Sequence, residues 1–339
     1  MRRFLPCLLL LLALPPRGAA GSQISSPPTL LGSVATPGDA FDVVLRDHYA
    51  LVPSYDAGIQ VVDIADPTAP VIVASHDTPG YSVQCVLWEN QLFVADHAAG
   101  GLRILNITNP LQPVPLGSLV TGDAVLGVGA SNGLALAGYV SGGFDVVDVT
   151  VPAQPVVEST VPTQGSPRHF IARDNRLYVA DHGAGVRIYD IATISSPQLL
   201  DTLAFFRPTG LDLVANTLYV ADFDGLHVVD VADPADPVAL GDTALPGPAI
   251  KVHVVDGYAF VADHVAGGLQ VVDVADPGHP IPVTGFATGF YAHGIAVRAP
   301  YAYLADGAGL KVFRVFEAPV AVEESTIGGL KARFRGNEE

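Results

Sequence analysis

A ring-shaped side chain follows a short phrase that recurs along the chain. The phrase Val94-Ala95-Asp96 returns at Val179 and Val261, and a histidine comes directly after it each time. The residues in this position, including the less regular copies of the phrase, are Tyr55, His97, Tyr139, His182, Phe223, His264 and Gly307. Aromatic rings stack on other flat groups, and imidazole binds metals and carries protons. Two interpretations stay open: the rings pack against the next repeat or cap its turn, or they form a rim that faces a ligand.

A metal site is the first chemistry to consider, because His97, His182 and His264 are all potential ligands. Zinc requires about four ligands, each about 2.0 to 2.3 Å from one ion. The three histidines belong to alternate repeats, and a large ring of repeats would hold them too far apart. The sequence therefore predicts no metal and no cofactor.

Charged and polar residues gather in the segment that precedes each ring-shaped residue. They are Asp42, Gln84, Arg168, His169, Lys251 and His293. Folding the first hairpin of a repeat about its turn places Asp181 opposite Arg168, and it places Asp306 opposite His293 in the last repeat. Cross-strand charge pairs follow from this arrangement. Such pairs either satisfy each other at the edge of a packed ring or line a polar binding pocket.

The repeats that must position these residues have a period of roughly 40 residues, which is typical of solenoids and propellers. When the repeats are aligned on the aspartate of the Val-Ala-Asp phrase, seven residues are expected to be equivalent: Ser54, Asp96, Gly138, Asp181, Asp222, Asp263 and Asp306. Each unit holds four short segments rich in apolar and aromatic residues, such as KVHVV, YAFVAD, GLQVVDV and PIPVTGF, separated by turn residues. A four-stranded repeat that is apolar on both faces must bury both, and a radial arrangement does so. The sequence predicts an all-β protein, a seven-bladed β-propeller of four-stranded antiparallel blades.

The N-terminal segment carries the signal for ring closure. Residues 28–38, PTLLGSVATPG, match residues 237–247, PVALGDTALPG, without a gap. The segment therefore supplies a fourth strand that the last unit lacks, and we expect it to pair antiparallel with residues 309–315. Closure by residues 319–325, PVAVEES, is the alternative.

A second phrase, G-[LIV]-x-[VI]-[VYL]-[DN]-[VI] followed by a proline, recurs as GIQVVDIADP, GLHVVDVADP and GLQVVDVADP. This pattern resembles the LVIVD-repeat family of secreted propeller proteins over roughly residues 28 to 315. The resemblance implies a propeller fold and a secreted or surface location, and it implies no established activity. The aspartate or asparagine that ends this phrase is expected to accept backbone N–H bonds within the turn that follows.

The ends of the chain predict export. Residues 1–20 hold two arginines before an apolar run, a third arginine after it and small residues at the end, as a secretory signal peptide does. Its removal leaves 14 basic against 34 acidic side chains, which disfavours nucleic acid as a partner. No other segment reaches the roughly 20 apolar residues that span a bilayer.

Residues 28–317 are expected to form the propeller. Residues 318–339 are expected to form a tail, in which the segment STIGGLKARFR is similar to sorting-related tails of secreted bacterial proteins. Cys85, alone after cleavage, is expected to be a buried apolar residue.

Two functions fit these observations. The regularity of the repeats favours a secreted or surface-displayed, non-catalytic and monomeric propeller, which binds a protein or polysaccharide through the face where the innermost strands begin. The alternative is a propeller hydrolase or lyase at the mouth of the central channel, with His169, His293 or Lys251 as base. His169 and Lys251 are not repeated, since the equivalent positions in three other blades are Leu126, Gly210 and Gly294. A hydrogen-bond network joining His169, Lys251 and Asp42 would favour the enzyme.

Overall fold

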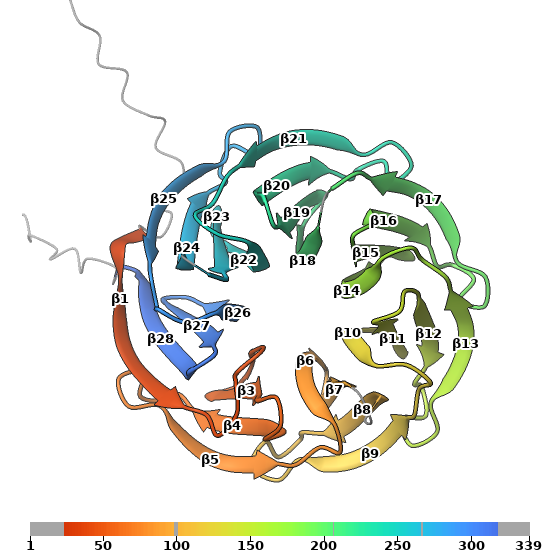
Figure 1. Ribbon diagram of the computed structural model, residues 1–339, viewed down its shortest axis with the longest axis horizontal. Helices are drawn as coiled ribbons and strands as arrows, with labels where there is room; N and C mark the ends of the chain where they lie inside the picture. The colour runs from red at the N-terminus through yellow and green to blue at the C-terminus, as the bar shows by residue number, and fades with distance from the viewer. Residues whose placement is uncertain (1–23, 98–100, 206, 266, 318–339) are drawn as a thin grey trace, which may run out of the picture.

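Seven four-stranded antiparallel sheets stand in a ring around a central channel in the computed structural model (Figure 1). The structure describes residues 24–97, 101–205, 207–265 and 267–317, and these residues contain strands and turns without a helix. The prediction of a seven-bladed β-propeller is therefore confirmed. No helix in the described ranges is long and apolar enough to cross a membrane. The predicted signal peptide, the alternative closing segment 319–325 and the tail 318–339 lie outside the described residues.

The blades follow the repeats, and the strands of each run outward from the channel. Blade one holds β2 (Val44–Arg46), β3 (Tyr49–Pro53), β4 (Ile59–Asp63) and β5 (Val71–His76). Blade two holds β6 (Tyr81–Trp88), β7 (Gln91–His97), β8 (Gly101–Asn106) and β9 (Val114–Leu119). Blade three holds β10 (Val125–Ser131), β11 (Leu134–Tyr139), β12 (Phe144–Asp148) and β13 (Val156–Val161). Blade four holds β14 (Ser166–Arg173), β15 (Arg176–His182), β16 (Gly185–Asp190) and β17 (Gln198–Leu203). Blade five holds β18 (Pro208–Val214), β19 (Thr217–Asp222), β20 (Gly225–Asp230) and β21 (Val238–Thr243). Blade six holds β22 (Ala249–Val255), β23 (Tyr258–Asp263), β24 (Gly268–Asp273) and β25 (Ile281–Phe286). Blade seven holds β26 (Ala292–Arg298), β27 (Tyr301–Asp306), β28 (Gly309–Phe316) and the N-terminal β1 (Ile24–Ala35).

The N-terminal strand closes the ring as predicted. Strand β1 pairs antiparallel with β28, from Thr29 opposite Arg314 to Ala35 opposite Gly309. Its place on the outside of blade seven is visible at the left of Figure 1. The two ends of the propeller therefore share one sheet, and β1 covers the backbone edge that β28 would otherwise expose.

The hydrophobic core lies between neighbouring blades rather than at the centre of the ring. The second and third strands of each blade are buried on both faces, because each face packs against a different blade. Phe260 of blade six, for example, packs with Leu304 and Phe313 of blade seven. Cys85 is buried in the layer between blades one and two and forms no disulfide, as expected.

The aspartate or asparagine that ends the third strand of blades one to six has the predicted role in its turn. Its side-chain oxygen accepts the backbone N–H two residues further along, at 2.8 to 2.9 Å. The six residues that do this are Asp63, Asn106, Asp148, Asp190, Asp230 and Asp273. This hydrogen bond fixes the tight turn to the outer strand, which is a structural role.

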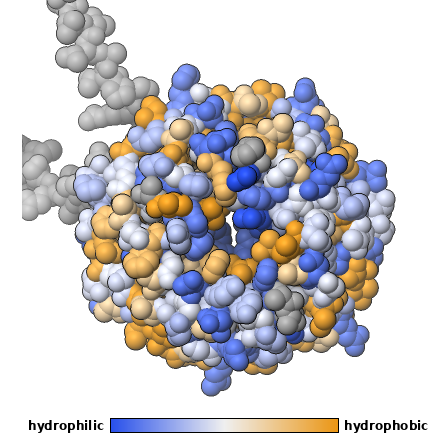
Figure 2. Space-filling view, viewed as in Figure 1, coloured by the Kyte–Doolittle hydropathy of each residue, from blue (hydrophilic) through white to orange (hydrophobic). Residues whose placement is uncertain are grey.

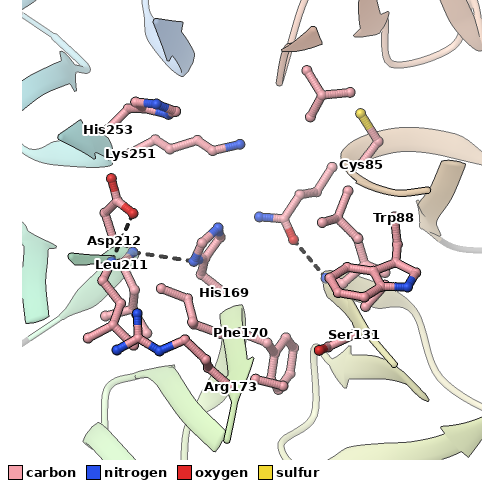
Figure 3. Close-up of a pocket in the computed structure, with 18 of the residues that line it drawn as sticks. Cys85, Trp88, Ser131, His169, Phe170, Arg173, Leu211, Asp212, Lys251 and His253 are labelled. Atoms are coloured by element: carbon pink, nitrogen blue, oxygen red, sulfur yellow. Dashed lines mark hydrogen bonds between the residues drawn. The ribbon is translucent and has the colours of Figure 1, made fainter. Parts of the chain in front are cut away.

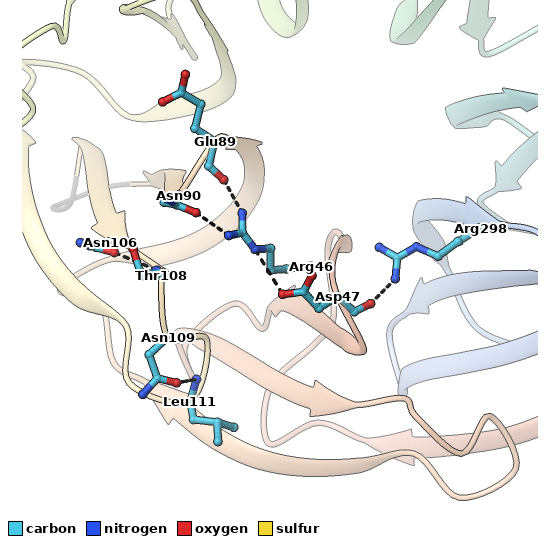
Figure 4. A network of polar contacts seen from close by, with 9 residues as sticks. All are labelled: Arg46, Asp47, Glu89, Asn90, Asn106, Thr108, Asn109, Leu111 and Arg298. Atoms are coloured by element: carbon cyan, nitrogen blue, oxygen red, sulfur yellow. Dashed lines mark hydrogen bonds and ion pairs between the residues drawn. The ribbon is translucent and has the colours of Figure 1, made fainter.

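Arginines join neighbouring blades at the face where the first hairpin of each blade turns, here called the far face. Three of them hold equivalent positions, and each donates to the carbonyl oxygen of a positive-φ residue in the next blade's hairpin turn. The donor and acceptor pairs are Arg46 with Glu89, Arg173 with Ala215, and Arg298 with Asp47 (Figure 4 shows the first and last). Because Arg298 belongs to blade seven and Asp47 to blade one, this contact also spans the closure of the ring.

Candidate functional site

A β-bulge near the start of the innermost strand distinguishes one residue in every blade. The pairing register shifts by one residue there in blades two to seven, as between Pro167 and His169. A bulge leaves one residue outside the ladder and re-aims its side chain. With the equivalent residue of blade one, these positions form the bulge ring, which consists of Phe41, Val83, Leu126, Arg168, Thr209, Ile250 and His293.

The bulge overturns the predicted cross-strand charge pairs. Asp181 lies opposite Pro167 rather than Arg168, and Asp306 lies opposite Ala292 rather than His293. The sequence-based alignment assumed an uninterrupted hairpin ladder, so it was displaced by one residue. The two carboxylates instead reach cations on the third strands of their own blades. Asp181 Oδ2 accepts from Arg187 Nε at 2.8 Å, and Asp306 is ion-paired with Lys311.

All seven residues of the bulge ring line one cavity at the mouth of the channel, here called the funnel. Its volume is about 300 Å³, and it contains eight of the predicted site residues: Asp42, Gln84, Arg168, His169, Phe223, Lys251, His264 and His293. Figure 2 shows an opening at the centre of the ring, with strongly hydrophilic side chains at its margin and hydrophobic ones close by. The face where the innermost strands begin therefore gathers most of the predicted residues around one hollow, and we call it the mouth face.

The next residue along each innermost strand forms a second ring, here called the waist. It consists of Asp42, Gln84, Gly127, His169, Gly210, Lys251 and Gly294. The position equivalent to His169 in blade three is thus Gly127, not Leu126, for the same reason of register. Below the waist the channel opens into a second cavity of about 530 Å³. Gln84, His169 and Lys251 lie between the two cavities and line both of them.

The polar members of the waist fasten one blade to another. Val128 N–H donates to Gln84 Oε1 at 2.7 Å, and Leu211 N–H donates to His169 Nδ1 at 3.3 Å. Each of these donors belongs to the blade that follows the acceptor. The side chains therefore satisfy backbone groups that an innermost strand would otherwise leave without a partner.

Lys251 makes the longest of these connections. It reaches from blade six to Asp42 of blade one, and the two form an ion pair in which Asp42 is only 2% exposed. Asp42 also accepts the backbone N–H groups of Val43, at 2.8 Å, and Cys85, at 3.3 Å. Blade seven lies between the two partners, and its waist residue is Gly294.

The three glycines of the waist allow the innermost strands to approach each other closely. A Cβ atom on Gly127 or Gly210 would lie 2.6 Å from a backbone oxygen of the next blade, and one on Gly294 would lie 2.6 Å from Asp42 Cα. Backbone atoms cannot move aside as a flexible side chain can. Around the waist, some neighbouring innermost strands are therefore joined by polar side chains, and others approach each other directly through their backbones at the glycines.

Replacing a waist glycine tests this packing. Gly210→Ala is expected to lower the free energy of unfolding by about 1 to 3 kcal/mol, because the added methyl group must push two blades apart. Chemical denaturation monitored by circular dichroism measures the change. Gly122→Ala is the matched control, since a Cβ there meets nothing within 4 Å, and it should leave stability unchanged or slightly increased. Equal stability of the two variants would contradict the close approach.

His169 and Lys251 are brought near each other, as the enzyme alternative requires, but both hold structural contacts. Figure 3 shows the two side chains pointing into the lower cavity from different blades. Burial, together with the positive charge of Lys251, lowers the pKa of His169 to about 3, so this imidazole is a weak base. Its Nδ1 is occupied by Leu211 N–H, and the Lys251 ammonium is paired with Asp42. His293 also has a pKa lowered to about 4, mainly by burial.

Rings from four neighbouring blades stack into a continuous row on the mouth face. The ring centroids are 4.4 to 6.5 Å apart, and several pairs are nearly parallel, such as Tyr55 and Tyr81 at 5° and His264 and Tyr291 at 14°. We call this row the aromatic arc, and in order of contact it consists of His97, Tyr81, Tyr55, Phe41, His293, His264 and Tyr291. Tyr81 and Tyr291 are 40% and 55% exposed, so the arc presents ring surface to solvent.

The remaining predicted rim residues do not join the arc. His182 and Phe223 pack edge to face at 5.3 Å, on the other side of the channel mouth. The assignment of Tyr139 to the ring position was wrong: Tyr139 lies opposite Val125 as Asp96 lies opposite Ser82, so it holds the aspartate position of blade three. It donates to Asp145 Oδ2 of its own blade at 2.5 Å, and burial raises its pKa. The rim of ring-shaped residues is therefore split, since one part stacks in the arc and the rest packs elsewhere.

Sequence reasoning missed Phe41, Tyr81 and Tyr291. Tyr81 and Tyr291 hold equivalent positions two residues before the bulge, where the other blades carry unlike residues such as Arg207 and Pro248. A search for repeated residue types passes over such a position. Phe41 and His293 hold equivalent positions six periods of 42 residues apart, but their residue types differ, so the repeat pattern did not bring Phe41 to notice.

Comparison with known protein families agrees with the repeat pattern. The LVIVD repeat model matches residues 37–78, 168–203, 212–243, 246–288 and 289–313, which together make up more than half of the chain. The chain belongs to the LVIVD-repeat family. The matched segments of this LVIVD-repeat protein include the bulge-ring and waist residues of blades one, four, six and seven.

Solved structures share the fold of this LVIVD-repeat protein at low sequence identity. The Neurospora crassa Pan2 WD40 domain is 14% identical, with a TM-score of 0.66 over 88% of this chain and 98% of that one. The Doa1 WD40 propeller is 12% identical, with a TM-score of 0.63 over 85% and 97%. The computationally designed Ika8 protein is 14% identical, with a TM-score of 0.62 over 84% and 99%. These likenesses concern the fold alone, and a search of curated proteins found no match.

No group of three metal-ligating side chains lies close together within the described ranges. His97, His182 and His264 stand in blades two, four and six, and each packs against a different aromatic ring. The arrangement thus offers ring faces, one funnel and a set of polar groups as its means of recognition.

Proposed function

We propose that this LVIVD-repeat protein is a non-catalytic binding propeller, exported and displayed or released outside the cell, whose mouth face binds a polysaccharide. The aromatic arc carries the proposal. Flat rings with exposed faces match the apolar faces of sugar rings, and tyrosine adds a hydroxyl group for hydrogen bonding. The predicted signal peptide supports an extracellular site of action.

A protein ligand is the second candidate for the same face. Exposed tyrosines are common in protein interfaces, and Phe290 adds a further ring that is 55% exposed beside the arc. The ammonium of Lys311 lies 5.4 Å from the centre of that ring. A flat, partly charged surface of this kind fits either ligand class, and the funnel at its centre favours a ligand with a group that can enter it.

The observed contacts favour binding over catalysis. A general base needs a free lone pair and a pKa near the working pH. His169 and Lys251 instead hold blades together, and the pKa of His169 is lowered to about 3. The polar groups of the channel therefore serve as fixed hydrogen-bonding groups rather than as a proton-transfer pair.

Removing the two exposed tyrosines tests the proposed face. The combined variant Tyr81→Ala and Tyr291→Ala is expected to weaken binding at least 10-fold, because aromatic anchors supply much of the binding energy at such surfaces. Biolayer interferometry of the mature chain against immobilised xylan, galactan, dextran and polygalacturonate measures the change. A pull-down from the culture medium of the producing organism, with the mature chain as bait, tests for a protein ligand in parallel.

The control variant is Val71→Ala combined with Val238→Ala, which removes exposed apolar groups from outer strands β5 and β21. It should bind as the unmodified chain does. The proposal fails if no polysaccharide and no protein is retained, or if the two double variants bind equally well.

A further inference from the structure

Arg168 is the one residue of the bulge ring that carries a permanent charge. The other members are apolar, except for a threonine and a histidine whose pKa is lowered to about 4. All seven side chains line the funnel. A guanidinium in a wall that includes Phe41, Val83, Leu126 and Ile250 costs free energy unless something compensates its charge.

No described residue supplies that compensation. Arg168 has no hydrogen bond or ion pair with another residue of the described ranges, and its buried Nε has no acceptor among them. Burial and the like charge of Arg207 lower the pKa of Arg168. The guanidinium thus lies in a partly dehydrated site beside another positive charge.

Other cations of the mouth face differ in this respect. Arg187 donates to Asp181 at 2.8 Å, and Lys251 is paired with Asp42. Both of these carboxylates are occupied, since Asp181 also accepts from Thr163 Oγ1 at 3.0 Å and Asp42 accepts two backbone N–H groups. The funnel therefore has a place for one further negative charge that none of the described residues fills.

The groups around Arg168 restrict the kind of anion. Gln84 uses its carbonyl oxygen on Val128 N–H, and its amide nitrogen has no partner among the described residues. Phe223, His264 and His293 offer ring surfaces in the same funnel. A ligand that fits combines a carboxylate, a hydroxyl group that accepts from the amide, and an apolar ring face.

We propose that the funnel binds the carboxylate of a uronic acid residue of a polysaccharide, with Arg168 as its cation. This inference rests on the proposed function of the mouth face and adds the class of sugar. The funnel volume of about 300 Å³ is at the lower end of ligand pockets and suits a single sugar ring. The guanidinium and carboxylate can form two parallel hydrogen bonds. Because the protein has a strong negative net charge, a chain with isolated uronic acids binds more readily than a densely charged polyuronate.

The test uses a matched pair of probes. One probe is a xylo-oligosaccharide that carries a single glucuronic acid, and the other is the same oligosaccharide without the acid. Titration calorimetry of the mature chain is expected to show at least 10-fold tighter binding of the acidic probe. Arg168→Gln should abolish this preference, and Arg168→Lys should retain only part of it, since lysine cannot form the paired hydrogen bonds.

Arg173→Gln is the matched control, because it removes the same charge from the far end of the same strand, outside the funnel. It should keep the preference for the acidic probe. Arg168→Gln should unfold at the same or a higher temperature than the unmodified chain, because it removes a charge without a partner, so lost binding would not reflect lost folding.

Equal binding of the two sugars, no binding of either, or an unchanged preference in Arg168→Gln would overturn the inference. An acidic hexapeptide that binds through Arg168, where the acidic sugar does not, would also overturn it in favour of a protein ligand. If a neutral polysaccharide binds and is lost in the Tyr81→Ala and Tyr291→Ala variant, the proposed function stands while this inference fails.

Discussion

A disulfide between positions 29 and 314 is expected to raise the unfolding midpoint of the propeller by about 6 °C. Thr29 and Arg314 are exposed partners in the β1 and β28 register, so Thr29→Cys and Arg314→Cys place two thiols across the closure. The bond would close a loop of nearly the whole propeller. The chain-entropy model assigns such a loop about 5 kcal/mol, which corresponds to several degrees for a domain of this size.

The reduced form of the same variant is its own control and should unfold like the unmodified chain. Cys85 is buried, so it should not compete for the new thiols. Deleting residues 24–35 is the complementary experiment and should cause aggregation, because it leaves the backbone edge of β28 without a partner. Failure of the disulfide to form, or a deletion variant as stable as the unmodified chain, would contradict closure by the N-terminal strand.

The ion pair between Asp42 and Lys251 should be the most costly side-chain contact of the channel to break. Asp42→Ala is expected to lower the free energy of unfolding by about 3 to 5 kcal/mol, because it leaves a largely buried ammonium without its partner. It also removes the acceptor for the backbone N–H groups of Val43 and Cys85. Urea denaturation provides the measurement.

A double-mutant cycle separates the pair from the rest of this network. Lys251→Met alone should also destabilise, and the combined variant should be about 2 kcal/mol more stable than the sum of the two single effects predicts. Additivity within about 0.5 kcal/mol would mean that the two side chains do not depend on each other. Gln84→Ala removes a neutral hydrogen bond of the waist and serves for comparison. It should lower the free energy of unfolding by about 1 to 3 kcal/mol.

The overall architecture could be predicted from the sequence because each repeat contains the residue pattern of the same four strands. The period of 41 to 43 residues gives the number of blades, and the likeness between residues 28–38 and 237–247 assigns the closing strand. The turn aspartates were predictable for the same reason, since a local hydrogen bond depends only on the neighbouring residues. Asp63 and its equivalents confirm this.

The site was predictable only in part. The bulge adds one residue to a strand without changing the residue pattern, so Asp181 was assigned to Arg168 instead of Arg187. The link between Lys251 and Asp42 joins residues 209 positions apart across an intervening blade, and no local pattern encodes such a contact. The sequence indicated the arc at the repeated residues Tyr55, His97 and His264 and at the polar residue His293, and it missed Phe41, Tyr81 and Tyr291.

Hydroxyl-radical footprinting is the most direct measurement of the central claim, which is that the mouth face is the binding surface. The mature chain is labelled with and without the polysaccharide that it retains in the binding panel, and oxidation is measured at each aromatic residue. Tyr81, Phe290 and Tyr291 should be protected, while Trp88, which lines the cavity below the waist, should be oxidised equally in both states. Protection of Trp88 or of the outer strands, with Tyr81 and Tyr291 unchanged, would contradict the account.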